Sequence, residues 1–161
     1  MKTLILVRHA KSSHSLGISS DFNRPLNERG FRQAAEMGDT LFKKKILIDQ
    51  FVSSPALRAK TTAELFAAEY DRKMKEILYL PSLYHANADN FQEIIHGLGD
   101  DFQHIALFSH NPGITDFASS LTQTHITHMP TCSVFAVTAS IDSWKNFANA
   151  AKNFLFFYTT E

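Results

Sequence analysis

Short continuous runs of hydrophobic residues alternate along the chain with stretches in which hydrophobic residues recur at helical spacing. Residues 3–7 and 105–108 are apolar almost throughout, which is typical of strands buried on both faces of a sheet. Weaker patterns predict further strands at residues 50–53, 77–80, 134–138 and 154–158.

Four stretches between these strands carry one apolar stripe each and are predicted to be helices. The stripes are Phe31, Ala34, Ala35, Gly38, Leu41 and Phe42; Ala59, Ala63, Phe66 and Ala67; Phe91, Ile94, Ile95 and Leu98; and Ile114, Phe117, Ala118 and Leu121. Before the second stripe, Ser54 and Pro55 favour a helix start, with Ser54 as the N-cap residue and Pro55 in the first turn. A polar loop from about residue 10 to residue 27 precedes the first helix, and loops of this length are often functional.

Strands that alternate with helices predict an α/β domain with a mostly parallel sheet. In such sheets ligands bind beyond the carboxyl ends of the strands, so the residues that follow the strands are candidate site residues. Arg8 and His9 end the first apolar run, His110 follows the run at 105–108, and Arg58 lies just after the strand at 50–53. Three segments that are distant in sequence would therefore deliver these four side chains to one edge of the sheet.

Composition and charge narrow the possible functions. The 161 residues are 44% hydrophobic and 20% charged, which suits one globular domain over residues 1–161. Sixteen basic and sixteen acidic residues give a net charge of zero, which argues against a general nucleic-acid binder. The one run of three basic residues, at 43–45, fits a solvated helix end better than a docking patch.

The N-terminal apolar run does not resemble a targeting or membrane segment. It breaks at Arg8 and His9 after five residues, which is shorter than the core of a signal peptide and far shorter than a transmembrane span. We therefore expect a cytoplasmic protein with no membrane contact. Cys132 is the single cysteine, and it is expected to be a buried structural thiol.

The four candidate side chains suit the chemistry of a phosphate group. Arginine grips phosphate oxygens with a bidentate fork and stays charged, so Arg8 and Arg58 would bind the anion. A neutral imidazole is a nucleophile near pH 7, and its attack on phosphorus gives a phosphohistidine that water then hydrolyses. A second histidine in its imidazolium form would help to stabilise the transferring group.

Four short motifs make the sequence resemble the histidine phosphatase superfamily, the phosphoglycerate-mutase-like group. They are residues 8–12 (RHAKS), 24–30 (RPLNERG), 53–63 (SSPALRAKTTA) and 109–113 (SHNPG), in the order that the family has them. Within the superfamily the chain is most similar to the short phosphohistidine phosphatases of the SixA type, by its small size and by residues 24–30, 83–86 and 110–113.

The resemblance implies a three-layer sandwich with a mostly parallel central sheet and helices on both faces. It implies His9 as the nucleophile, with Arg8, Arg58 and His110 around the phosphate. Arg24, Ser12 and His85 become candidates for substrate binding. No metal or organic cofactor is implied, and the partner would be a phosphohistidine-bearing protein or a small phosphorylated substrate.

One position departs from the family pattern. Many members carry a glutamate that protonates the leaving oxygen, and the matching position here is His85. An alkoxide needs such a proton, whereas a protonated phosphohistidine departs as neutral imidazole. We therefore hypothesise that the missing carboxylic acid makes the site favour P–N over P–O substrates. A rival hypothesis is that His85 replaces the glutamate as the acid, and Asp89 could also substitute for it. The last possibility is that His85 is a loop residue without a role.

Other functions are compatible with the same residues. A phosphatase for a small phosphorylated metabolite would use the same chemistry, and a phosphate-binding module without turnover would keep only the binding. A metal hydrolase could use His9, His85 and His110, but Arg8 beside His9 disfavours a second cation there.

Overall fold

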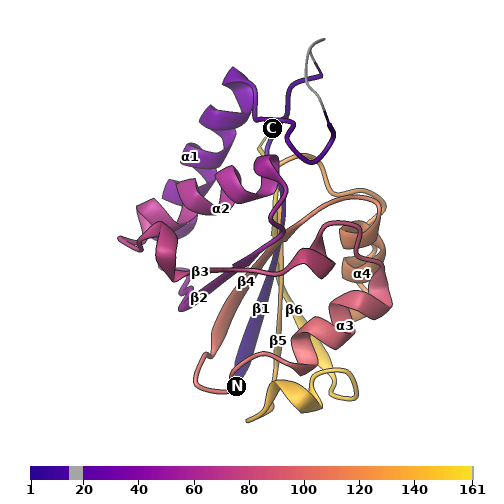
Figure 1. Ribbon diagram of the computed structural model, residues 1–161. Helices are drawn as coiled ribbons and strands as arrows, with labels where there is room; N and C mark the ends of the chain where they lie inside the picture. Colours follow the sequence, from indigo (N-terminus) through magenta and orange to yellow (C-terminus); the bar gives the residue numbers. More distant parts are fainter. Residues whose placement is uncertain (15–19, 161) are drawn as a thin grey trace.

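The computed structural model describes residues 1–14 and 20–160, and in that part of the chain six strands form one sheet (Figure 1). The strands are β1 (Lys2–Arg8), β2 (Gln50–Ser53), β3 (Ile77–Tyr79), β4 (His104–Ser109), β5 (Val134–Ala139) and β6 (Lys152–Tyr158). Their spatial order is β3-β2-β4-β1-β5-β6, in which the first four are parallel and the last two join antiparallel. The predicted mostly parallel α/β sheet is therefore confirmed.

Helices cover both faces of the sheet, as Figure 1 shows with α1 and α2 on one side and α3 and α4 on the other. They are α1 (Glu28–Lys43), α2 (Leu57–Glu69), α3 (Ala88–His96) and α4 (Gly113–Leu121), with short 3-10 turns η1 (Met74–Glu76), η2 (Pro81–Leu83) and η3 (Trp144–Asn146). Alternate side chains of one strand enter opposite cores: Leu4 and Leu6 pack with α3 and α4, whereas Ile5 and Val7 pack with α1 and α2. This alternation explains why β1 is apolar throughout.

Two local expectations differ from the structure. The second helix begins at Leu57, and Ser54 is not its N-cap residue, because the Ser54 hydroxyl accepts from the Ala56 N–H in the turn before the helix. On α1, the exposed fractions of Phe31 and Phe42 are 48% and 52%, so neither belongs to the buried stripe. The buried face of α1 instead includes Gly30 and Gln33, and the side-chain oxygen of Gln33 accepts from the backbone N–H of Lys11 at 2.9 Å.

The carboxyl ends of the parallel strands meet at one edge of the sheet. Arg8 of β1 pairs with Ser109 of β4, and Ser53 of β2 pairs with Phe108, so the chain leaves all three strands at the same level. Part of the predicted loop at 10–27, namely residues 15–19, lies outside the described residues. The predicted burial of Cys132 is confirmed.

Two glycines allow the backbone to pack closely at this edge. A Cβ on Gly30 would lie 2.0 Å from the carbonyl oxygen of Lys11, and a Cβ on Gly113 would lie 1.8 Å from that of Ala86. Both distances are far below contact, so each position requires glycine for steric reasons. Among the described helices, none has the length and apolar character to cross a membrane.

Candidate active site

The structure brings Arg8, His9, Arg58 and His110 together at the carboxyl edge of the sheet. The ring centroids of His9 and His110 are 5.2 Å apart. His9, Arg58 and His110 expose only 6%, 5% and 9% of their surface. Polar side chains buried to this degree are commonly kept for a purpose other than packing, because desolvation of a charge is costly.

One hydrogen bond fixes the tautomer of His9. Its Nδ1 lies 2.7 Å from the carbonyl oxygen of Ala10, and a carbonyl oxygen can only accept, so Nδ1 carries the proton. The lone pair is therefore on Nε2. Burial, together with the positive charges of Arg58 and Arg8, lowers the pKa of His9 to about 3, so the ring is neutral near pH 7.

His110 is held by the turn that follows β2. Its Nε2 lies 2.8 Å from the hydroxyl oxygen of Ser54, while its Nδ1 is buried without a hydrogen-bond partner among the described residues. Burial first, then the neighbouring His9 and Arg58, lower the pKa of His110 to about 3. His110 is therefore neutral near pH 7 in the structure, because desolvation and the neighbouring charges disfavour a further positive charge, and its imidazolium form during phosphoryl transfer stays a prediction.

The two arginines of the site are fixed by different acceptors. The Nη1 of Arg8 donates to the carbonyl oxygen of Met129 at 3.0 Å, and burial together with Arg58 and Arg24 lowers the pKa of Arg8. The Nη1 of Arg58 donates to the carbonyl oxygen of Asp21 at 2.8 Å. In the described part of the chain, the Nε atoms of Arg8 and Arg58 are buried and have no acceptor.

Asp21 is a site residue that the sequence reasoning missed. Its carboxylate accepts from the Nη2 of Arg58 at 3.0 Å, from the Nη2 of Arg24 at 3.2 Å and from the hydroxyl of Tyr84 at 2.6 Å. The hydrogen bond from Tyr84 and the charge of Arg58 hold the pKa of this carboxyl well below its usual range. The available signal was the position of Asp21 three residues before Arg24, a spacing at which opposite charges often pair.

Arg24 and Ser12 lie beside the four central residues. The Nη1 of Arg24 donates to the hydroxyl of Ser12, and the positive charge of Arg24 contributes to the lowered pKa values of Arg8 and His9. An isolated bridge between Ser12 and Leu26 holds the two segments together. Two of the three predicted substrate-binding residues are therefore close to the centre.

A cavity of about 410 Å³ opens beside His110 and Arg58. Of the two acids that the sequence offered, one lines this cavity and the other does not. His85 lines this cavity, with its ring packed against Tyr84 at a centroid distance of 3.9 Å. Asp89 is in the first turn of α3 and is not among the lining residues. The carboxylates that do line the cavity are Asp21 and Asp116 of α4.

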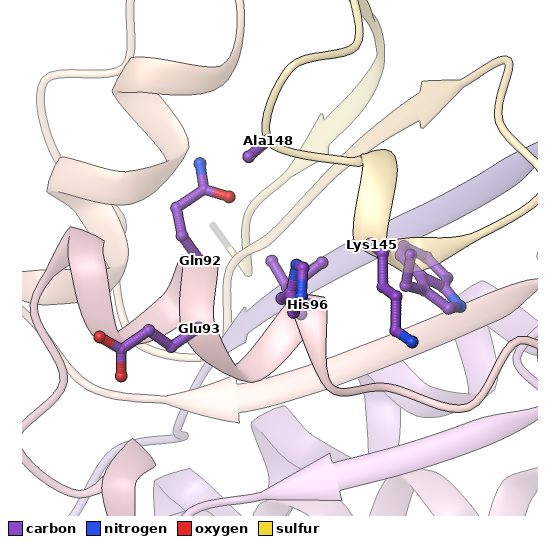
Figure 2. A pocket seen from close by; sticks show the side chains of 7 residues that line it. Gln92, Glu93, His96, Lys145 and Ala148 are labelled. Atoms are coloured by element: carbon purple, nitrogen blue, oxygen red, sulfur yellow. The ribbon is translucent and has the colours of Figure 1, made fainter.

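A second cavity, of about 330 Å³, lies between α3 and η3 (Figure 2). Figure 2 labels Gln92, Glu93 and His96 of α3 together with Lys145 and Ala148 among the residues that line it, and none of the predicted site residues is among them. Within residues 1–14 and 20–160, no group of three or more His, Cys, Asp and Glu side chains is placed to hold a metal ion. His9, His85 and His110 therefore do not form such a group.

Comparisons with known proteins place the chain by its sequence and its fold. A family model described as histidine phosphatase superfamily (branch 1) matches residues 4–96. A chloroplastic protein of Arabidopsis thaliana is 30% identical over 152 residues, which cover 89% of this chain and 69% of that protein.

Solved structures show the same fold. One from Agrobacterium tumefaciens that bears the name phosphohistidine phosphatase SixA has a TM-score of 0.83 at 20% identity, over 99% of each chain. The protein histidine phosphatase SixA complexed with tungstate has a TM-score of 0.80 at 20% identity, over 96% of this chain and 95% of that one. At such low identity, the structural likeness concerns the fold alone.

Proposed function

The chain belongs to the histidine phosphatase superfamily, and we propose that it hydrolyses phosphohistidine in a protein substrate through a covalent intermediate on His9. The observation that carries the proposal is the tautomer of His9: Nδ1 donates to Ala10, so the lone pair of Nε2 is available to attack phosphorus. The ring is neutral at pH 7, which is the nucleophilic form. Arg8, Arg58 and His110 surround it, and they supply the donors that a transferring phosphoryl group requires.

The proposed reaction has two steps. In the first, Nε2 of His9 forms a bond to phosphorus while the bond from phosphorus to the leaving atom breaks, and that atom takes the electron pair. In the second, water attacks the phosphohistidine and releases inorganic phosphate and neutral His9. The guanidinium groups of Arg8 and Arg58 offset the negative charge on the phosphoryl oxygens in both steps.

The leaving group decides which substrate the site can use. A phosphohistidine that is protonated on its free ring nitrogen departs as neutral imidazole, so the enzyme need not donate a proton. An alkyl phosphate would depart as an alkoxide, which needs an acid. Asp21, which lines the cavity, is held as a carboxylate by Arg58 and Tyr84 and is a poor acid, which supports the preference for P–N bonds.

The two steps of the proposed reaction use only side chains of this protein and water. We therefore propose a metal-independent reaction with no organic cofactor, and we keep the cytoplasm as the proposed location. The charge of Arg24 is among those that lower the pKa values of Arg8 and His9. We propose that Arg24 adds a further contact to the phosphate. Ser12 and His85 are proposed to contact the substrate at the two sides of the site.

A comparative assay tests the proposal. A phosphohistidine-bearing protein and a panel of sugar and glycerate phosphates are offered, with chelator present, to wild type, His9→Ala and His96→Ala. His96 lines the cavity of Figure 2, so His96→Ala is a matched control that removes an imidazole elsewhere. We expect turnover of phosphohistidine by wild type and control, and a loss on the order of a thousandfold or more in His9→Ala.

Other results would redirect the proposal. Turnover mainly of a metabolite would keep the intermediate on His9 and change the substrate. Phosphate binding without turnover of any substrate would indicate a binding module. Activity lost with chelator and restored by a metal ion would refute the metal-independent steps.

A further inference from the structure

A wide apolar groove lies far from the candidate active site. It has a volume of about 750 Å³ and is formed by the end of α1, the segment before β2 and the segment after α2. Asp49 and His104, which border it, stand at the amino ends of β2 and β4. The catalytic residues stand at the carboxyl ends of the strands, so the groove is at the opposite edge of the sheet.

The groove combines a fixed aromatic floor with exposed apolar side chains. The hydroxyl of Tyr70 donates to the carbonyl oxygen of Ile46 at 2.6 Å, and its ring meets the ring of Phe42 edge-on at a centroid distance of 5.3 Å. Phe42 and Leu47 nevertheless expose 52% and 62% of their surface. Large apolar side chains that gather in one exposed groove often mark an interaction site.

The charge of the groove is positive, although the whole chain is neutral. Lys43, Lys45 and Arg72 border it, and in the described part of the chain neither Lys45 nor Arg72 forms an ion pair. The one acidic residue of the lining, Asp49, does not balance them. Its two oxygens accept from the backbone N–H groups of Gln103 and His104, and its single negative charge leaves the lining with a net positive charge.

We propose that this groove docks an acidic amphipathic helix of a partner protein. Bulky apolar side chains of such a helix would lie against Phe42, Leu47 and Tyr70, and its carboxylates would face Lys45 and Arg72. Two members of the basic run at residues 43–45, Lys43 and Lys45, thus have a binding role in addition to the stabilisation of the helix end. Because the groove is opposite to the catalytic edge, a docked partner leaves the active site open.

Charge complementarity and shape together favour a peptide over a lipid surface. A membrane surface is flat and would contact a protruding patch, whereas these apolar side chains surround a hollow of a volume that is usual for ligand sites. Duplex nucleic acid would use the cations but not the exposed apolar side chains, and a single strand would leave Leu47 unused. An acidic helix uses both features at once.

A binding experiment with a defined probe tests the proposal. The probe is a fluorescent synthetic peptide of about 15 residues with Leu at helical spacing and Glu elsewhere, and its anisotropy is measured against the full chain. We expect saturable binding that weakens about tenfold in Leu47→Asp and in Arg72→Glu, and that weakens with added salt. Both side chains are exposed, so both variants should keep the thermal stability of wild type.

Matched controls distinguish the groove from general stickiness. Leu155→Asp changes another exposed leucine, 47% exposed on β6, and should leave peptide affinity within about twofold of wild type. A peptide with the same residues in an order that destroys the apolar face should bind at least tenfold more weakly. Equal binding of both peptides, equal binding by Leu47→Asp, or recruitment only to anionic phospholipid vesicles would overturn the proposal.

Discussion

Asp21→Asn should strengthen the binding of phosphate while it weakens the fold. In the structure the carboxylate of Asp21 contacts Arg58 at 3.0 Å and Arg24 at 3.2 Å, and these are two of the cations assigned to the phosphate. Asparagine keeps the size of the side chain and one acceptor oxygen but removes the negative charge. The substitution therefore tests whether Asp21 competes with phosphate or only holds the arginines in place.

The magnitude follows from the charges. Two unit charges about 4 Å apart interact with about 1 kcal/mol in water and about 4 kcal/mol at an effective dielectric constant of 20. Because the side chain of Asp21 is 51% exposed, the lower value applies. Removal of the repulsion between Asp21 and a phosphate on Arg58 should improve the affinity by about 1 kcal/mol, which is about fivefold. The loss of two ion pairs should lower the free energy of unfolding by about 1 kcal/mol.

Isothermal titration with inorganic phosphate and thermal unfolding measure the two effects separately. Asp39→Asn is the matched control, because Asp39 forms an ion pair with Lys43 at 2.9 Å on the exposed side of α1. The control should leave phosphate affinity unchanged. Weaker phosphate binding by Asp21→Asn would refute the reasoning, and it would show that Asp21 positions Arg58 rather than competing with the ligand.

Three further predictions concern protonation, packing and leaving-group charge. The pKa values of His9 and His110 lie near 3 in the folded chain and near 6.5 when unfolded, so the unfolded state binds more protons between these values. The free energy of unfolding, measured with denaturant, should therefore fall as pH falls from 6.5 toward 3, and less steeply in His110→Asn. Gly113→Ala places a Cβ 1.8 Å from the carbonyl oxygen of Ala86 and should destabilise the fold by about 2 kcal/mol or more, measured by thermal unfolding. Asp116→Asn removes a carboxylate that lines the cavity and would attract the positive charge of a protonated phosphohistidine leaving group. The substitution should therefore lower kcat/KM for a phosphohistidine peptide about threefold and leave kcat/KM for an aryl phosphate, whose leaving group carries no positive charge, unaffected.

The sequence predicts the parallel core and its catalytic edge well, because the responsible signals are local. The continuous apolar character of residues 3–7 and 105–108 comes from burial on both faces, and the structure places one core on each side of β1. The residues just after these runs reach one edge because parallel strands share a direction. Arg8, His9 and His110 could therefore be placed together before their contacts were known.

The contacts across this edge could not be predicted in the same way. Asp21 meets Tyr84 across 63 residues of sequence, and Ser54 meets His110 across 56, so no local period announces either pair. The predicted N-cap role of Ser54 is wrong for the same reason, namely a contact between residues that are distant in sequence. Serine before proline is a common helix start, but here the hydroxyl serves the turn and the imidazole, and the helix begins at Leu57.

The imidazolium expected at His110 and the neutral ring found there are reconciled by the charge of the substrate. Burial is the main cause that disfavours a proton on His110, and the neighbouring imidazole of His9 and the charge of Arg58 add to the effect. A phosphate dianion against these groups reverses the sign of the local charge, and an opposite charge within a few ångströms raises a histidine pKa. Phosphate binding should therefore be coupled to proton uptake, and His110 becomes a proton carrier only when the anion is in place. Burial first, and then the arginines that bind phosphate, lower the pKa of His9, so the nucleophile is unprotonated before the substrate arrives.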